Sequence, residues 1–413
     1  MCDLVRIKKV VKNSFMLTAR LCSVLIMLLG CICVVNNSSA HVDSDSKIPS
    51  GIENKNTHIT RFNTVFEKYL EEEFTPRLPG YALAVIIGGD VVFSKVSGVR
   101  RLGADSLIDF HTAFRIASVS KTFTPAVIST LTRPAVDFES LVSAYLPTLK
   151  LQKTAYLSEL TVRHLLSHST GLMPHAYTNL IQDGVAYRDV VKMLDRVPFV
   201  CKPGGCYSYQ NVIYNLAGDI VEQVTGLSYS HVVSKNLFVR LGMEDSSLGL
   251  QAFLHNTNIA MPHKWNKRLR LWQPIKPKEN YYQLAPAAGV NASLNDMTIW
   301  LKAQLGLAAN VLSVQQLNEI QTPNIKTSRK KAHYMRKSWD GVTNPQYALG
   351  WRTFDFKHVN GFVHHGGWVE GARAEIVFNR GLNMGMVFLT NSEPAIASDI
   401  VPNFITHYLN TKL

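Results

Sequence analysis

Residues 114–123 read FRIASVSKTF. Ser118 and Lys121 are three positions apart in this stretch, and the residues after Ser118 continue an apolar pattern with helical spacing. Side chains three positions apart on a helix lie on the same face. A serine hydroxyl is a weak nucleophile that needs a base within reach, and a lysine can be that base when burial lowers its pKa. The stretch therefore predicts a nucleophile, Ser118, that is activated by Lys121.

The Ser-x-x-Lys pattern by itself is not specific, because it occurs at Ser44–Lys47, Ser118–Lys121 and Ser328–Lys331. The first copy lies in a polar segment and the third in a basic one, so only the second opens an apolar helical run. We expect the start of that helix to favour a developing oxyanion. We also expect a bend or a loosened turn at Pro125, which lacks an amide donor.

The segment around Ser118 resembles the nucleophile segment of class C β-lactamases and related penicillin-binding proteins. The similarity extends from about Tyr81 to the C-terminus. It includes three further stretches in the same order, LLSHSTGL at 165–172, PAAGVNAS at 286–293 and YALGW at 347–351. The resemblance implies a β-lactamase/transpeptidase-like α/β fold of the α+β type. In that fold an antiparallel sheet is flanked by helices and carries an inserted, mainly helical lobe, and the resemblance implies no cofactor.

A second motif of the family, Tyr-x-Asn, matches YQN at 209–211. By resemblance, the Tyr209 phenol would relay a proton between Ser118, Lys121 and the leaving group, and the Asn211 amide would hold the acyl side chain of the substrate. A nearby ammonium group would favour the phenolate form of Tyr209. The alternative is a loop tyrosine that packs on the core.

The third motif departs from the lactamase pattern, since class C enzymes have Lys-Thr-Gly on a strand where this chain has HHG at 364–366. Strand alternation places His364 and Gly366 on one face, so His364 is predicted to replace the lysine. By resemblance, the Gly367 amide would form the oxyanion hole with the Ser118 amide. A histidine is mostly neutral at pH 7 and should hold a substrate carboxylate less firmly than lysine. Related families with His-x-Gly include D-aminopeptidase-like enzymes, some esterases and the eukaryotic β-lactamase-like proteases. The alternative is a structural pair of strand histidines.

The periodicity of the chain predicts strands near both ends and helices between them. We expect helices at 59–73 and 397–409, a mainly helical stretch at 117–306, and strands at 81–87, 91–97, 348–356, 362–365, 374–378 and 384–389. The simplest packing is one antiparallel sheet built from both termini. Residues 58–413 then form the hydrolase domain, with a sheet lobe at 58–116 and 340–413 and a helical lobe at 117–339.

Residues 1–40 have the pattern of a cleaved export signal, followed by a polar linker at 41–57. The basic residues at its start precede an apolar run at 21–35 and small residues at 38–40. Leu28–Cys31 resembles a lipoprotein cleavage box, so a membrane tether is the alternative to simple cleavage. The chain is therefore predicted to be periplasmic or attached to the cell envelope.

Cysteine placement favours the same compartment. Four of the six cysteines lie within residues 1–40, and Cys201 and Cys206 flank a KPGG turn. Such a turn can bring two cysteines within disulfide distance, and an oxidising compartment preserves the bond. Two free thiols are the alternative. A metal site is not expected, since His164 and His168 have ligand spacing but lack the adjacent glutamate of a zinc hydrolase.

The chain is basic, with a formal net charge of +13. Basic stretches that contain aromatic residues occur at 264–278 and 326–337. In an exported protein this pattern favours a solvated face or attraction to an anionic envelope surface over nucleic-acid binding. We therefore expect a small-molecule or peptide substrate and no nucleic acid, while the oligomeric state stays open.

Together these features predict an exported serine acyl hydrolase that forms an acyl-enzyme on Ser118. The expected substrates are β-lactams or D-amino-acid peptides of the cell wall. The alternatives are a carboxylesterase of the β-lactamase-like type and a sensor that binds cell-wall fragments or β-lactams without turnover.

Overall fold

A computed structural model describes residues 50–131, 136–328 and 332–411 of the chain. The predicted leader at 1–40, with its four cysteines, lies outside these residues, and so does most of the predicted linker. Residues Gly51–Leu413 form one compact unit. No helix in the described part of the chain combines the length and the apolar character needed to cross a membrane.

One large antiparallel sheet organises the unit, with strand order β2-β1-β13-β12-β11-β10-β9-β8 among the described residues. Its strands are β1 (Gly80–Ile87), β2 (Asp90–Gly98), β8 (Ile325–Lys326), β9 (Val342–Tyr347), β10 (Arg352–Phe356), β11 (Val359–Val369), β12 (Ala372–Asn379) and β13 (Met384–Thr390). Next to the edge strand β2, β1 pairs with β13 in a register that joins Tyr81 to Thr390. The predicted sheet, built from both ends of the chain, is therefore confirmed.

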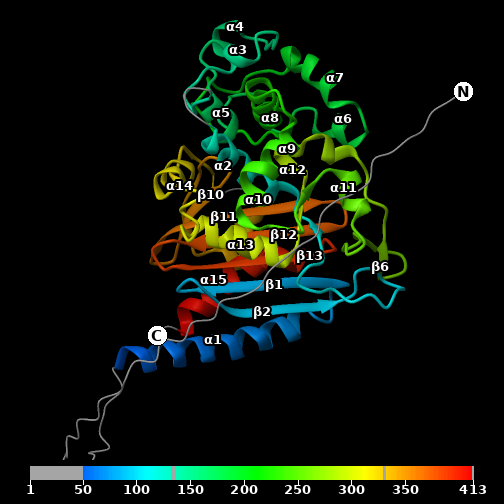
Figure 1. The fold of residues 1–413 in the computed structure, drawn as a ribbon, viewed down its shortest axis with the longest axis vertical. Coiled ribbons are helices and arrows are strands. Elements are labelled where there is room, and N and C mark those ends of the chain that lie inside the picture. Colours follow the sequence, from blue (N-terminus) through cyan, green and yellow to red (C-terminus); the bar gives the residue numbers. More distant parts are fainter. Residues whose placement is uncertain (1–49, 132–135, 329–331, 412–413) are drawn as a thin grey trace, which may run out of the picture. The chain divides into compact units, whose positions relative to one another are not determined.

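Helices cover both faces of this sheet, which explains why every residue of β1 is buried. Leu83 and Val85 point to the face covered by α1 (Ser50–Glu73) and α15 (Ile400–Thr411), where they join one apolar cluster. Ala82 and Ala84 point to the opposite face and join a second cluster with the central helices. Figure 1 shows α1 and α15 on one side of the strands and the remaining helices on the other.

The central helices that matter for the site are α2 (Phe123–Thr130), α8 (Asn211–Thr225), α12 (Ala285–Ala288) and α13 (Leu294–Gln304). The other helices are α3 (Val142–Tyr145), α4 (Thr154–Leu157), α5 (Val162–Leu166), α6 (Thr178–Gln182), α7 (Tyr187–Lys192), α9 (Tyr229–Val233), α10 (Val239–Leu241), α11 (Leu250–His255) and α14 (Val314–Gln321). Two small sheets add β3 (Phe114–Arg115), β4 (Ser247–Leu248) and β7 (Val290–Ala292), and the hairpin of β5 (His263–Asn266) and β6 (Leu271–Pro274).

Several boundaries differ from the sequence prediction. Helix α1 begins at Ser50, inside the segment expected to be a linker. The strand expected at 348–356 begins only at Arg352, because Gly350 adopts a left-handed φ of 70°. Strand β9 was not predicted, since its sequence VTNPQY contains Asn344 and Pro345, which are uncommon in strands. The predicted division of residues 58–413 into two lobes stays a prediction.

Candidate active site

The segment around Ser118 is a 3₁₀-helix, η1 (Ala117–Thr122), which continues into the α-helix α2. The single helix expected from the sequence is thus divided. Pro125 lies in the first turn of α2. Backbone amides there have no acceptor within the helix, so the amide that proline lacks costs no hydrogen bond. Ala117 has a φ of 49°, an uncommon value for a residue other than glycine, just before Ser118. Ser118 is partly exposed, although its neighbours are buried, so its hydroxyl is accessible to a substrate.

Strand β11 approaches this turn very closely at Gly367. A Cβ atom on Gly367 would lie 2.1 Å from the carbonyl oxygen of Ile116 and 3.2 Å from the Cβ of Ala117. Only glycine fits such an approach without a shift of the backbone. The structure therefore brings Gly367 beside the nucleophile segment, as the sequence predicted, while its part in an oxyanion hole stays a prediction.

Lys121 is fully buried, and the Nζ atom has three polar neighbours. It lies 3.3 Å from Ser118 Oγ, 2.8 Å from Asn211 Oδ1 and 2.9 Å from the carbonyl oxygen of Ala287. The last two are oxygen acceptors with no proton to give. A neutral amine has two N–H donors and one lone pair, so donation to Asn211 and Ala287 leaves the lone pair for the hydroxyl of Ser118. This arrangement suits a lysine that accepts a proton from serine.

Burial and a nearby cation both favour the neutral amine. Loss of solvent around Lys121 lowers its pKa well below the usual value, and the charge of Arg352 lowers the pKa further. The lowering by burial agrees with what the sequence predicts for Lys121. Arg352 itself was not singled out, although it directly follows the YALGW stretch.

Tyr209 completes the contacts of the nucleophile, since its hydroxyl donates to Ser118 Oγ over 3.1 Å. Burial raises the pKa of Tyr209 above its ordinary value, and the hydrogen bond to Ser118 only partly offsets that rise. The expected phenolate is therefore not supported. The reason is physical: desolvation of the phenol outweighs the hydrogen bond to Ser118 and the charge of Arg352, which both favour the phenolate.

Asn211 is the first residue of α8, and its side chain makes a contact with Lys121 that the sequence did not predict. Its Oδ1 accepts from Lys121, so this half of the amide is already used inside the protein. The Nδ2 group remains for a substrate. The proposed contact with an acyl side chain stays a prediction.

His168 holds the segment that carries Tyr209. Its carbonyl accepts from the Ser208 amide over 2.7 Å, and its Nδ1 accepts from the Gln210 amide over 3.2 Å. Its ring lies 4.1 Å from the ring of Tyr209, centre to centre. Three contacts to consecutive residues thus fix the backbone and the ring of Tyr209. His168 has a φ of 56°, and burial lowers its pKa well below the ordinary value, so the imidazole is neutral.

The two histidines of β11 face opposite sides of the sheet. The prediction placed His364 on the side of Ser118, but the structure places His365 there. His364 hydrogen-bonds through Nε2 to Glu375 over 2.8 Å and packs against Trp339 and Phe354, on the face of α1 and α15. The adjacent Gly366 points the same way, since a Cβ atom there would meet the Glu375 carboxylate. His364 and Gly366 therefore do not line the site. Strand alternation does separate His364 and Gly366 from His365, but the sequence does not reveal which of the two faces meets Ser118.

His365 takes the place expected for His364. Its Nδ1 lies 2.9 Å from the carbonyl of Gly366, which can only accept, so Nδ1 carries the proton. Its Nε2 then accepts from the hydroxyl of Tyr347 over 2.9 Å. Burial and the charges of Arg352 and Lys121 lower the pKa of His365 well below its usual value. His365 is therefore a neutral imidazole.

The loop before Tyr209 is closed by a disulfide between Cys201 and Cys206, in agreement with the predicted pairing. The closed loop lies on the segment that carries His168. The Gly204 amide donates to the Ser169 carbonyl over 2.7 Å, and the Val200 amide donates to the Gly171 carbonyl over 2.7 Å. The disulfide loop therefore forms the outer support of the His168 and Tyr209 segments.

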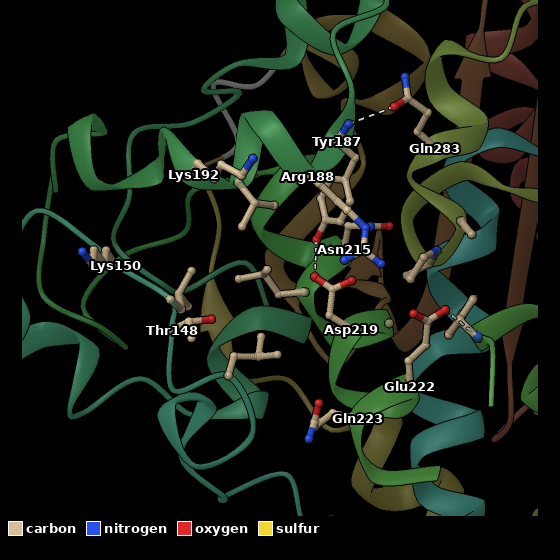
Figure 2. A pocket seen from close by; sticks show the side chains of 18 of the residues that line it. Thr148, Lys150, Tyr187, Arg188, Lys192, Asn215, Asp219, Glu222, Gln223 and Gln283 are labelled. Atoms are coloured by element: carbon tan, nitrogen blue, oxygen red, sulfur yellow. Dashed lines mark hydrogen bonds between the residues drawn. The ribbon is translucent and has the colours of Figure 1, made fainter. Parts of the chain in front are cut away.

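Two cavities lie near these elements. One, of about 560 Å³, is bounded by Val369 and Tyr281, which pack on Ala117 beside the nucleophile, and its rim includes Arg115, Lys264, Lys276 and Lys278. The other, of about 890 Å³, lies along α7 and α8 (Figure 2). In Figure 2 the hydroxyl of Tyr187 points to Asp219, to which it donates over 2.8 Å. Neither cavity is lined by Ser118 or by another predicted site residue.

Comparison with known proteins matches residues 62–406 to a family described as beta-lactamase. The chain belongs to the beta-lactamase family. This confirms the family resemblance seen in the sequence. The family assignment supports a serine hydrolase, but the roles of individual site residues rest on the geometry above and stay predictions.

The curated relatives described here have low sequence identity to this chain. The protein flp of Staphylococcus aureus (strain MRSA252) is 26% identical over 362 residues, which cover 86% of this chain and 66% of flp. The unguisins hydrolase ungD' of Aspergillus campestris is 25% identical over 345 residues, which cover 81% of this chain and 62% of ungD'. The chain thus spans slightly less than two thirds of the length of each relative.

Solved structures show the fold. The octameric penicillin-binding protein homologue from Pyrococcus abyssi aligns with a TM-score of 0.69 at 22% identity, over 85% of this chain and 76% of that one. The crystal structure of SurE aligns with a TM-score of 0.68 at 19% identity, over 87% of this chain and 77% of that one. Both likenesses support the predicted β-lactamase/transpeptidase fold.

The centre of the site is predictable from the sequence, whereas the residues that support it are not. Ser118, Lys121, Tyr209 and Asn211 come together as predicted, whereas His168, His365 and Arg352 were not assigned to the site. A signal for two of them was present, since His168 lies inside the family-like stretch LLSHSTGL and Arg352 follows YALGW.

Proposed function

We propose that the chain is a serine acyl hydrolase that works through an acyl-enzyme on Ser118. One observation carries the proposal: the partly exposed Ser118 Oγ lies within hydrogen-bond reach of both the buried Lys121 amine and the Tyr209 hydroxyl. A nucleophile in contact with a neutral base and with a neutral proton donor has what acyl transfer requires.

The same contacts suggest a sequence of proton transfers. Ser118 gives its proton to Lys121 as Oγ attacks the acyl carbon and a tetrahedral intermediate forms. When the bond to the leaving group breaks, the Tyr209 hydroxyl gives its proton to the leaving atom, and the proton held by Lys121 restores the phenol. Water then attacks the acyl carbon and passes a proton to the same pair, which releases the acid and regenerates Ser118.

The favoured substrates are β-lactams and D-amino-acid peptides, both of which offer an amide and a carboxylate. Strand β10 pairs with β11 only as far as His364, so residues 365–369 have no partner strand on that side among the described residues. An extended peptide has room to pair with this edge. The lining of the 560 Å³ cavity holds four cations, among them Arg115 and Lys278, and two acids, so its net positive charge suits an anionic substrate. One relative is named as a hydrolase of unguisins, which supports a hydrolytic function.

A carboxylesterase is the second candidate, and one observation favours it. The neutral His365 cannot attract a substrate carboxylate as the lysine of lactamases does. An uncharged ester would lose no binding energy when a neutral histidine replaces the lysine, whereas a β-lactam would lose part of the attraction to its carboxylate.

The test is to incubate the chain without residues 1–40 with a fluorescent penicillin, a chromogenic cephalosporin and p-nitrophenyl butyrate, and to follow protein mass and product together. Turnover or a stable adduct supports the proposal when it is lost in Ser118→Ala. Turnover of the cephalosporin would indicate a lactamase, and turnover of the ester alone would indicate an esterase. A lasting penicilloyl adduct without product would indicate a peptidase or a sensor. An adduct that persists in Ser118→Ala would disprove the role of Ser118.

We also propose that the chain is exported. The leader pattern at 1–40 and the disulfide between Cys201 and Cys206 both suit an oxidising compartment. Fractionation of cells that express the full chain tests this directly, and accumulation in the cytosolic fraction would contradict it.

A further inference from the structure

The hairpin of β5 and β6 is a two-stranded sheet that is separate from the main sheet. Its strands pair Trp265 with Trp272 and Asn266 with Leu271, and residues 267–270 form the connecting loop. In Figure 1 the hairpin lies at the right-hand edge of the fold, outside the layers of the main sheet. An isolated pair of strands gains little stability by itself, so the surface that it presents calls for an explanation.

The tip of the hairpin exposes apolar and basic side chains together. Leu269 is 54% exposed, and Leu271 and Trp265 are each 44% exposed. Between and beside them lie Lys267, Arg268 and Arg270, which are also exposed. Isolated exposed leucines are ordinary, but an exposed cluster of this kind within a few residues marks an interaction surface.

The charge of this tip is not balanced within the described part of the protein. Residues 263–278 contain six lysine and arginine side chains and no acid. Lys264, at the base, forms an ion pair with Glu370. Lys267, Arg268 and Arg270 form no ion pair with any acid in the described residues, so their three charges are available to an external anion.

The tip is held in a defined shape. Asn266 Oδ1 accepts from the amides of Arg268 and Leu269, each over 3.0 Å, which closes the turn. At the base, the indole of Trp272 donates to the carbonyl of Arg77 over 2.8 Å and stands edge-on to Trp265, with ring centres 5.2 Å apart. The body of the protein thus anchors the hairpin. Leu269 lies at the exposed tip with Lys267 and Arg268, while Arg270 and Leu271 line a surface cavity that residues 76–79 and Glu393 complete.

We propose that this hairpin tip docks on the surface of an anionic lipid bilayer. Leu269 and Leu271 would enter the boundary of the acyl chains, Trp265 would lie at the level of the headgroups, and the three cations would contact anionic headgroups. A soluble polyanion such as a nucleic acid would use the cations but would offer no partner to the leucines. The aliphatic tip therefore favours the bilayer.

The experiment uses the chain without residues 1–40, which retains the compact unit Gly51–Leu413. Sedimentation with vesicles of phosphatidylglycerol and phosphatidylcholine in equal parts is compared with pure phosphatidylcholine. The parent chain should bind the anionic vesicles and lose most of that binding at high salt. Lys267→Gln with Arg268→Gln and Arg270→Gln should weaken binding roughly 100-fold, at about fivefold per cation. Leu269→Ser should weaken it about tenfold with every charge intact.

A matched control removes the same charge elsewhere, by Lys150→Gln with Arg188→Gln and Lys235→Gln, all exposed positions outside the hairpin. It should bind the vesicles as the parent does, and thermal unfolding should show that each variant is folded. The proposal is overturned if the parent ignores anionic vesicles, or if the control weakens binding as much as the hairpin variant. It is also overturned if Leu269→Ser binds unchanged, since the surface would then recognise charge alone.

Discussion

Lys121 can act as a base only while its amine is neutral. Its pKa is lowered from 10.5 by burial and by Arg352, so the neutral form is populated at a lower pH than for an exposed lysine. Acylation should therefore rise with pH and fall as acid protonates the amine. Lys121→Met and Tyr209→Phe should each slow acylation by about two to four orders of magnitude. Single-turnover labelling across a pH series measures both effects, with the exposed Lys192→Met as control; near-parent rates would remove either residue from the mechanism.

His168 should act through Tyr209 rather than on the substrate. His168→Asn keeps an acceptor for the Gln210 amide and tolerates the left-handed backbone, whereas His168→Leu does neither. We expect the Leu variant to lower kcat roughly 100-fold with little change in KM, and the Asn variant to recover part of the loss. A merely structural role would instead lower thermal stability equally in both variants and leave kcat of the folded fraction intact.

The centre of the site could be predicted because it depends on short-range patterns. Ser118 and Lys121 are one helical turn apart, and Tyr209 and Asn211 share a tripeptide. The proton state of Tyr209 could not be predicted, because burial comes from segments remote in sequence. The choice between His364 and His365 also could not be made from the sequence. Strand alternation shows that the two side chains lie on opposite faces of the sheet, but it does not show which face meets Ser118.

Among the elements, the disulfide loop should matter more to rate than to stability. The loop between Cys201 and Cys206 is short, so its closure stabilises the fold by only about 2 kcal/mol. Cys201→Ser with Cys206→Ser should therefore lower the Tm by a few degrees, while acylation slows roughly 10- to 100-fold because the His168 and Tyr209 segments lose their support. Comparing Tm with acylation rate tests this; an unchanged rate would mean that the hydrogen bonds of the loop suffice.

Helix α8 carries a carboxyl group whose burial has a cost at neutral pH. Burial raises the pKa of Asp219 from 3.8 to about 6, so the folded state favours the protonated form. Its contribution to stability is greatest below the unfolded pKa and is lost as the pH rises through about 6. Asp219→Asn, which can still accept from Tyr187, should stabilise the protein by about 2 kcal/mol at pH 8 and by little at pH 4. Urea unfolding at the two pH values gives the difference, and an equal effect at both would contradict the shift.

Element boundaries were the weaker part of the sequence prediction. The apolar alternation of β1 and β13 and the helical spacing of α15 were sufficient for their detection. Strand β9 was missed, and the expected strand at 348–356 began too early, because Gly350 and Pro345 act through backbone geometry that periodicity does not register.

At the scale of the whole molecule, the two terminal helices stabilise one face of the sheet together. Phe404 of α15 is fully buried and contacts the rings of Phe62 and Phe66 of α1. Phe404→Ala should cost about 3–5 kcal/mol of unfolding free energy, as a large cavity in a core does. The midpoint of urea unfolding measures it, and Val239→Ala, an exposed site, serves as control. A loss below 1 kcal/mol would mean that the helices pack loosely.

The pairing of β1 with β13 also sets the order in which the protein can be made. Gly80 accepts from the side chain of Thr390, 310 positions later. At about 5–20 residues per second, a ribosome needs roughly 15–60 s to synthesise the segment between them. Throughout that interval β1 has been translated but its inner neighbour does not exist, so the central sheet can close only after almost the whole chain has been released. The main sheet therefore stays incomplete during synthesis, and under the proposed export its unpaired strands would still be available to a translocation channel.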